Sequence, residues 1–173
     1  MKPADTSLSK KEGPTHEWFM KQALKEAKKA YDKDETPVGA VIVKGDKIIA
    51  RGHNLKELKQ DPTMHAEISA LQKASKKLGT WRLNECDMYV TLEPCTMCAG
   101  AILHARINRL FIGAPDPKAG AVGSVINVLK VEQFNHRVEV VQGVLEDECS
   151  DILKRFFREL RARKKNSRLN TNF

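Results

Sequence analysis

The stretch Pro37-Val38-Gly39-Ala40-Val41-Ile42-Val43 carries no polar side chain. A strand with one solvated face alternates apolar and polar residues, whereas a strand covered on both faces is apolar throughout. The run therefore predicts a strand buried on both faces, which calls for helices on each side of a sheet. A turn at Lys44–Lys47 and a second strand over Lys47–Gly52 follow, so these two strands are expected to pair as a hairpin.

Helices and strands alternate along the rest of the chain. Apolar residues recur at three- and four-residue steps in amphipathic helices. This spacing predicts helices over Thr15–Tyr31, Ala66–Leu78 and Glu146 to about Lys165, with a short helix over Thr96–His104. Further strands are predicted over Met88–Leu92, Arg109–Gly113 and Val138–Val141, and loops over Asn54–Thr63 and Ala114–Gly123. The alternation predicts a layered α/β domain over residues 15–165, with polar tails over residues 1–14 and 166–173.

The charge is concentrated near the C-terminus. The 173 residues carry a net charge of +8, and eight Lys/Arg face a single acid, Glu159, between Lys154 and Arg168. Such a segment favours a phosphate-bearing partner, the alternative being a solvated helix end whose cations lie near the last carbonyls. Residues 1–13 contain no apolar signal region and no run is long enough to cross a bilayer. The four cysteines do not indicate a disulfide scaffold, so we expect a cytoplasmic protein without a membrane partner.

Two motifs predict a metal site: His65-Ala66-Glu67 and Pro94-Cys95-Thr96-Met97-Cys98. Two cysteines three apart lie on one face at the start of a helix, where the helix terminus also favours the thiolate. Two sulfurs and one imidazole favour zinc and leave its fourth position open, as a catalytic zinc requires. A redox pair or two buried thiols are the alternatives. A structural zinc would need a fourth ligand, and the spare thiols Cys86 and Cys149 stand at expected core positions.

Glu67 is the candidate catalytic residue. A carboxylate beside a hydrolytic zinc site can accept a proton from water and later deliver it to a leaving group. Residues two apart on a regular helix point about 200° away from each other. His65 and Glu67 can therefore share a site only if His65 lies in an irregular first turn, which the upstream Asp61-Pro62 pair favours. The alternative role for Glu67 is a first-turn acid that complements the helix dipole.

Around these residues the sequence resembles the zinc-dependent nucleoside and nucleobase deaminases, whose signature is H-x-E…P-C-x-x-C. It is most similar to the bacterial tRNA adenosine deaminase family over about residues 15 to 165. The matching stretches are Pro37–Val41, Gly52–Asn54, Trp81–Leu83, Tyr89–Ala101, Gly113–Lys118 with Gly120, Gly123–Ser124, Asn135–Arg137 and Phe156–Arg158. The resemblance implies a three-layer α/β/α cytidine-deaminase-like fold with a central mixed sheet of about five strands. It also implies a homodimer with one Zn²⁺ per subunit.

The resemblance assigns roles to individual residues. His65, Cys95 and Cys98 would hold the zinc, and Glu67 would shuttle protons. Asn54 would hydrogen-bond the base and Val38 would form an apolar wall. Contacts with the target or flanking nucleotides are implied for Asp116, Lys118, His136, Phe157 and Arg158. Several of these residues have other readings: Val38 and Phe157 as core, His136 as a structural histidine, and Asn54 as a turn cap.

The implied reaction is hydrolytic deamination of adenosine to inosine at the wobble position of a tRNA anticodon stem-loop, by zinc-activated water and a glutamate. The target base must be splayed out of a single-stranded loop, because its reactive carbon is unreachable in a stacked helix. One alternative is a guanine or cytosine deaminase that acts on a free base, which leaves the basic segment without a role. Another is an RNA-binding protein with a structural zinc, in which Glu67 would be dispensable.

Overall fold

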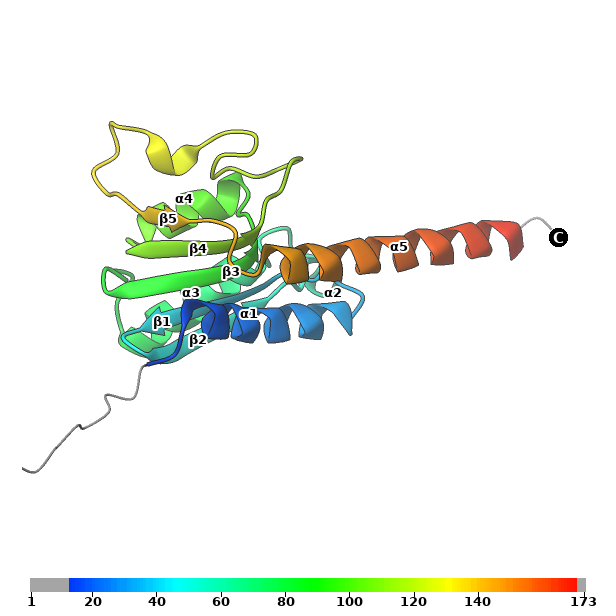
Figure 1. Cartoon of the computed structure of the whole chain (residues 1–173), viewed down its shortest axis with the longest axis horizontal. Coiled ribbons are helices and arrows are strands. Elements are labelled where there is room, and N and C mark those ends of the chain that lie inside the picture. The colour runs from blue at the N-terminus through cyan, green and yellow to red at the C-terminus, as the bar shows by residue number, and fades with distance from the viewer. Residues whose placement is uncertain (1–12, 171–173) are drawn as a thin grey trace, which may run out of the picture.

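The computed structural model describes residues 13–170, with side chains to residue 167. Its centre is a five-stranded mixed sheet in the order β2-β1-β3-β4-β5 (Figure 1). The strands are β1 (Gly39–Lys44), β2 (Lys47–His53), β3 (Cys86–Leu92), β4 (Arg109–Ala114) and β5 (Glu139–Val141). Strand β1 is antiparallel to both β2 and β3, whereas β3, β4 and β5 run parallel.

Helices cover both faces of the sheet. On one face α1 (His16–Tyr31) and α5 (Glu146–Asn170) pack through an aromatic cluster that includes Phe19, Tyr89 and Phe111. On the other face lie α3 (Ala66–Leu78) and α4 (Thr96–His104), packed on a larger aliphatic cluster. The remaining elements are the four-residue α2 (Lys56–Lys59) and a 3₁₀ turn, η1 (Val128–Lys130). The predicted three-layer α/β/α fold with a mixed sheet of five strands is confirmed.

Strand β1 explains why its sequence is apolar throughout. Val41 and Val43 enter the aromatic cluster, while Ala40 and Ile42 enter the aliphatic cluster, so successive side chains are buried on opposite faces. Gly39 lets α1 approach the strand, since a Cβ there would lie 2.0 Å from the Ala23 carbonyl oxygen. The sequence between Gly39 and Val43 therefore fixes the middle layer of the fold.

The element boundaries differ from the expected ones in a few places. Helix α1 begins one residue later than expected, because the Thr15 side chain caps it by accepting a hydrogen bond from the Trp18 N–H at 3.1 Å. Helix α5 continues to Asn170, beyond the expected end near Lys165. Helix α2 lies inside the segment expected to be a loop and is capped at its C-terminus by Gln60, whose φ is 51°.

The predicted tails fall partly outside the structure. Residues 1–12 and 171–173 lie outside the described residues, and the division into one domain over residues 15–165 with two tails stays a prediction. Within residues 13–170, no helix combines the length and apolar character that a bilayer span requires.

Candidate active site

A cavity of about 180 Å³ opens where the N-termini of α3 and α4 meet the ends of the strands. Its walls come from segments far apart in the sequence. The lining residues are Thr36, Val38, Asn54, Lys56, His65, Ala66, Glu67, Leu92, Glu93, Cys95, Asp116 and Ala119. The cavity thus contains six residues that sequence analysis selected from five separate segments, so the fold brings the predicted chemistry to one place.

His65, Cys95 and Cys98 lie close enough together to share one ion. Their ligand atoms all lie within 4.8 Å of one another, and His65 Nδ1 is 3.7 Å from Cys95 Sγ and 3.6 Å from Cys98 Sγ. His65 and Cys95 each occupy the N-cap of a helix, in extended backbone conformation. His65 and Glu67 can therefore face the same site although they are only two residues apart, because the chain at His65 has not yet entered the helix that carries Glu67.

The donor chemistry of the three residues suits a metal ion. A hydrogen bond from Cys98 lowers the pKa of Cys95 to about 4, and the same bond raises the pKa of Cys98. The pKa of His65 is raised, chiefly by its hydrogen bond with Cys95. The cluster therefore already carries one thiolate, and a metal ion would displace the proton that the sulfurs share. Zinc matches two sulfurs and one imidazole.

The composition of the cluster distinguishes an open site from a closed one. Among the His, Cys, Asp and Glu side chains of residues 13–167, His65, Cys95 and Cys98 form the group that is close enough together to hold a metal ion. Cys86 and Cys149 are free thiols in the core, and Cys149 belongs to the aromatic cluster under α5. Three protein ligands leave a tetrahedral ion one position for water or substrate, as a hydrolytic zinc needs.

Glu67 lies in the first turn of α3 and is 4% exposed. Burial raises the pKa of its carboxyl to about 7. A carboxyl group that exchanges its proton near neutral pH, next to a metal cluster, is suited to take a proton from water and pass it on. An acid in the first turn can interact with the helix dipole while it stays exposed to solvent. The burial of Glu67 therefore argues against a role limited to the helix dipole.

Asn54 follows β2 and is held by a buried acid that sequence analysis missed. The Asn54 Nδ2 group donates to Glu35 Oε2 at 3.4 Å, and Glu35 is 1% exposed. The same carboxylate accepts the backbone N–H groups of Glu57 at 3.2 Å and Leu58 at 2.6 Å. Glu35 thus ties Asn54 and the start of α2 together on one side of the cavity.

A second buried acid, Glu93, also lines the cavity. Its carboxylate accepts the backbone N–H groups of Asp116, Val122 and Ser124, each at 3.0 Å, and the Ser124 hydroxyl. Burial alone would raise the pKa of Glu93, but these donors together lower it. Gly120 allows the close approach, since a Cβ there would lie 2.4 Å from the Glu93 carboxylate. Glu93 therefore fixes the loop that carries Asp116 and Lys118.

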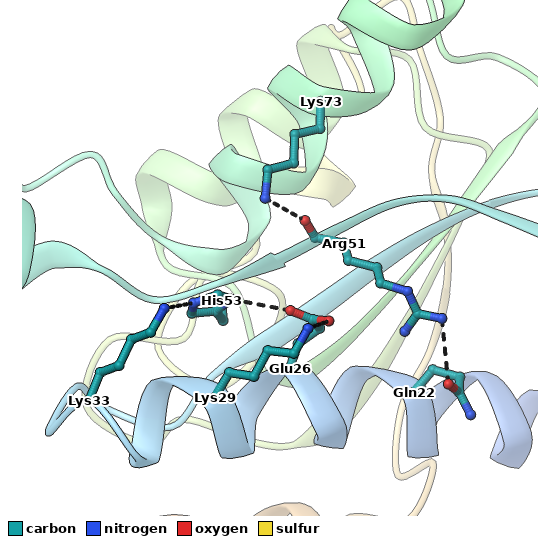
Figure 2. Close-up of polar contacts among 7 residues, drawn as sticks. All are labelled: Gln22, Glu26, Lys29, Lys33, Arg51, His53 and Lys73. Carbon is teal, nitrogen blue, oxygen red and sulfur yellow. Dashed lines mark hydrogen bonds and ion pairs between the residues drawn. The ribbon is translucent and has the colours of Figure 1, made fainter.

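The residue before Asn54 anchors β2 to α1 (Figure 2). His53 Nδ1 lies 3.1 Å from Glu26 Oε2, and its Nε2 lies 2.9 Å from Lys33 Nζ, with Lys29 completing an ion pair to Glu26 at 2.7 Å. Burial lowers the pKa of His53, so the neutral ring donates from Nδ1 and accepts at Nε2. The end of β2 is thereby fixed one residue from Asn54.

A wider groove of about 600 Å³ adjoins the cavity and shares Thr36, Leu92 and Asp116 with it. Its other lining residues are Pro115, Pro117, Lys118, Leu153, Lys154, Phe157 and Arg161. The groove brings the predicted contacts Asp116, Lys118 and Phe157 to the mouth of the cavity.

The two remaining candidates lie elsewhere. Arg158 lines a different hollow, together with Leu24 of α1. His136 has its Nε2 atom 2.8 Å from the Ile107 carbonyl oxygen and lines neither the cavity nor the groove. The structure thus gives His136 a hydrogen-bond partner of its own, on the protein backbone.

The comparisons with known proteins agree with this geometry. The model of the MafB19-like deaminase family matches residues 15–161. The tRNA-specific adenosine deaminase of Bacillus subtilis is 54% identical over 89% of this chain and 96% of that protein. A structure from work on A-to-I editing by tRNA:A34 deaminases superposes with a TM-score of 0.75 at 47% identity, covering 78% of this chain and 98% of that one. The guanine deaminase of Nitrosomonas europaea superposes with a TM-score of 0.70 at 25% identity, covering 82% and 84%.

The match to the Bacillus protein spans nearly the whole length of both chains, and it includes the cavity and the His65–Cys95–Cys98 group. Together with the family model, it shows that this chain belongs to the tRNA-specific adenosine deaminases, within the MafB19-like deaminase family.

Proposed function

We propose that this protein hydrolyses adenosine to inosine at the wobble position of tRNA. The observation that carries the proposal is the buried Glu67 beside the His65–Cys95–Cys98 cluster in a cavity that opens into a groove. The 54% identity to a tRNA-specific adenosine deaminase selects the substrate class among hydrolytic deaminases.

His65, Cys95 and Cys98 would hold a zinc ion, one in each subunit. Zinc supplies Lewis acidity, which makes water nucleophilic near neutral pH. Glu67 takes a proton from the attacking water and delivers it to N1 of adenine as the new C–O bond forms at C6. It then takes the second proton from the hydroxyl group added at C6 and delivers it to the departing amino group, so that the C–N bond breaks, ammonia leaves and C6 becomes a carbonyl. The base that remains is hypoxanthine.

The other cavity residues hold the base while this happens. Asn54, fixed by Glu35, would hydrogen-bond the adenine, and Val38 would form an apolar wall against its ring. Asp116, Lys118 and Phe157 would contact the flanking nucleotides in the groove. Arg158 would meet the RNA from the adjoining face of α5, and His136 would approach a flanking nucleotide. An anticodon loop offers a base in this extruded form at low cost in stacking energy.

Deamination of a free base is the second candidate, favoured by the likeness to the guanine deaminase. A free base would fit the cavity of about 180 Å³ and would leave the adjoining groove and the basic face of α5 unused. The first candidate therefore predicts deamination of a short RNA but not of the isolated base, and the second predicts deamination of the isolated base.

The test uses purified protein with zinc and an unmodified anticodon stem-loop that carries adenosine at the wobble position. Inosine in the RNA and no ammonia from free guanine, cytosine or adenosine is the expected result. Deamination of a free base alone would replace the proposal with the second candidate. Zinc binding without any deamination would favour a structural zinc.

A Glu67→Gln variant tests the proton shuttle. The amide keeps the size of the side chain but cannot accept and return a proton, so we expect zinc content to persist. Turnover is expected to fall by about 10²- to 10⁴-fold, the usual contribution of general acid–base catalysis. Turnover near that of the wild type would remove Glu67 from the mechanism.

We also propose that the protein works as a cytoplasmic homodimer. An apolar hollow between α3 and α4 is lined by Ile68, Leu71, Ala101 and Ala105, and by Trp81, which is 53% exposed. A second copy of the chain would cover this surface. Sedimentation of the wild type and of Trp81→Glu should give a dimer and a monomer, respectively; a monomeric wild type would contradict the dimer.

The cytoplasmic location rests on the cysteines. All four are free thiols, as expected for a protein of a reducing compartment.

A further inference from the structure

Four exposed cations of α5 share one face of the helix. Lys154, Arg158, Arg161 and Lys165 follow one another at steps of four, three and four residues. At 3.6 residues per turn these positions fall within an arc of about 60°, so they form a single row along the helix. All four side chains are exposed. We call them the cationic stripe.

Two cations outside the stripe, Arg155 and Arg163, take part in holding α5 against α1. The Arg163 guanidinium pairs with Asp34 at 2.7 Å, and the Arg155 guanidinium lies 4.9 Å from the centre of the Tyr31 ring. Tyr31 in turn donates to Glu159 at 2.5 Å. Arg155 and Arg163 therefore have partners within the fold. Of the stripe residues, Lys154 and Arg158 line the hollow beside α1, and Lys154 and Arg161 line the groove.

The stripe begins at the groove beside the active-site cavity. Lys154 and Arg161 line the groove together with Lys118 from the loop that Glu93 holds. From Lys154 to Lys165 the helix rises about 16 Å. Figure 1 shows the second half of α5, in orange to red, projecting beyond the sheet and the other helices. The row of charges thus leads from the mouth of the cavity out along a free helix.

We propose that the cationic stripe binds the phosphate backbone of the RNA strand that continues from the target nucleotide. The inference rests on the proposed function and adds the path that the RNA follows over the protein. A row of positive charge that starts at the groove complements a polyanion that leaves it. With about 3.4 Å per nucleotide along one strand of a duplex, 16 Å corresponds to roughly five nucleotides.

The experiment compares a stripe variant with a control of equal charge. The stripe variant carries Lys154→Gln, Arg161→Gln and Lys165→Gln, and the control carries Lys47→Gln, Lys76→Gln and Lys77→Gln. The control residues are exposed and lie on β2 and at the end of α3, away from the cavity. Glutamine keeps the helix propensity of lysine and arginine. Both variants are checked for wild-type melting temperature before RNA binding is measured at several salt concentrations.

The stripe variant should bind a full anticodon stem-loop on the order of tenfold more weakly than the wild type. The slope of log affinity against log salt should fall by about two units, since three phosphate contacts are lost at ~0.7 to 0.9 units each. The control should keep the wild-type slope within about half a unit. A seven-nucleotide RNA that contains only the loop offers fewer phosphates to the stripe. For this RNA, the affinities of the stripe variant and the wild type should therefore differ by less than they do for the full stem-loop.

Failure of this inference is separable from failure of the proposed function. If the wild type converts the stem-loop to inosine but the stripe variant keeps its affinity and salt slope, the stripe is a solvated helix face. Equal losses in stripe and control variants would show an effect of net charge and would also overturn the inference. If the wild type forms no inosine, the proposed function fails first.

Discussion

Asn54 depends on Glu35, a residue with no part in the chemistry. Glu35 is buried and accepts two backbone N–H groups as well as the Asn54 amide. We expect Glu35→Ala to lower kcat/KM by about tenfold or more and to destabilise the fold by about 2–3 kcal/mol, because buried donors lose their acceptor. Glu35→Gln keeps one acceptor oxygen and should restore most of the stability.

Kinetics separates positioning from stability for Glu35. If the carboxylate positions Asn54, Glu35→Gln should also have a lower kcat/KM than the wild type, even at temperatures far below the melting point of the variant. A Gln variant with wild-type kinetics would leave Glu35 a purely structural residue. Glu57→Gln serves as the control, since its exposed side chain lies beside the same loop and takes no part in the contact with Asn54.

The four thiols should react unequally. Burial raises the pKa of Cys149 to about 12 and also raises that of Cys86, so neither supplies thiolate at pH 8. We expect an alkylating reagent to leave all four cysteines of the zinc-loaded protein intact. After chelation Cys95, which is partly exposed, should become modified first. Mass spectrometry of the digested protein checks this order, and early modification of Cys149 would contradict it.

At the scale of elements, glycines set how closely helices approach the sheet. A Cβ at Gly39 would lie 2.0 Å from a carbonyl of α1, and a Cβ at Gly52 would lie 2.2 Å from the Ala66 carbonyl oxygen of α3. Each site therefore admits a helix backbone directly against a strand. At Gly100, inside α4, no atom beyond the adjacent residues and the helix's own backbone lies within 4 Å of the position a Cβ would take.

We expect Gly39→Ala to destabilise the protein by about 3 kcal/mol or more, since backbone must move to admit the methyl group. Gly100→Ala is the matched control and should be neutral or stabilising by up to ~1 kcal/mol, because alanine favours a helix. Urea denaturation of both variants measures the difference. Equal effects would mean that the contact at Gly39 relaxes without cost.

The sequence predicted the elements that carry a distinct apolar pattern, either a period or an unbroken run. Helices α1, α3 and α5 were recognised from apolar spacing, strand β1 from its unbroken apolar run, and the His65–Cys95–Cys98 group from its motifs. Helix α2 was missed because four residues are too few to show a period. Glu35 and Glu93 were missed because their partners are backbone N–H groups of distant loops, which leave no pattern in the sequence.

At the scale of the molecule, zinc would join two helices that are distant in sequence. The proposed ligands cap α3 and open α4, so an ion bound there stabilises the folded chain over the unfolded one. Zinc at a hundred times its Kd adds about 2.7 kcal/mol. Chelation should then lower the melting temperature by about 5–10 °C. A Cys95→Ser variant should lose most of this response, and an equal response in that variant would place the ion elsewhere.

The two edges of the sheet limit how copies of this chain can meet. At one edge β5 has only three residues, and at the other β2 pairs through a shifted register near Ile42. Lys73 from α3 donates to the Arg51 carbonyl oxygen at 2.9 Å and so occupies an acceptor of β2 (Figure 2). Short, bulged and charge-covered edges resist strand addition. Extension of the sheet into a neighbouring molecule, the first step towards fibrous aggregation, is therefore disfavoured at both ends, and copies of the protein are left to associate through their helices.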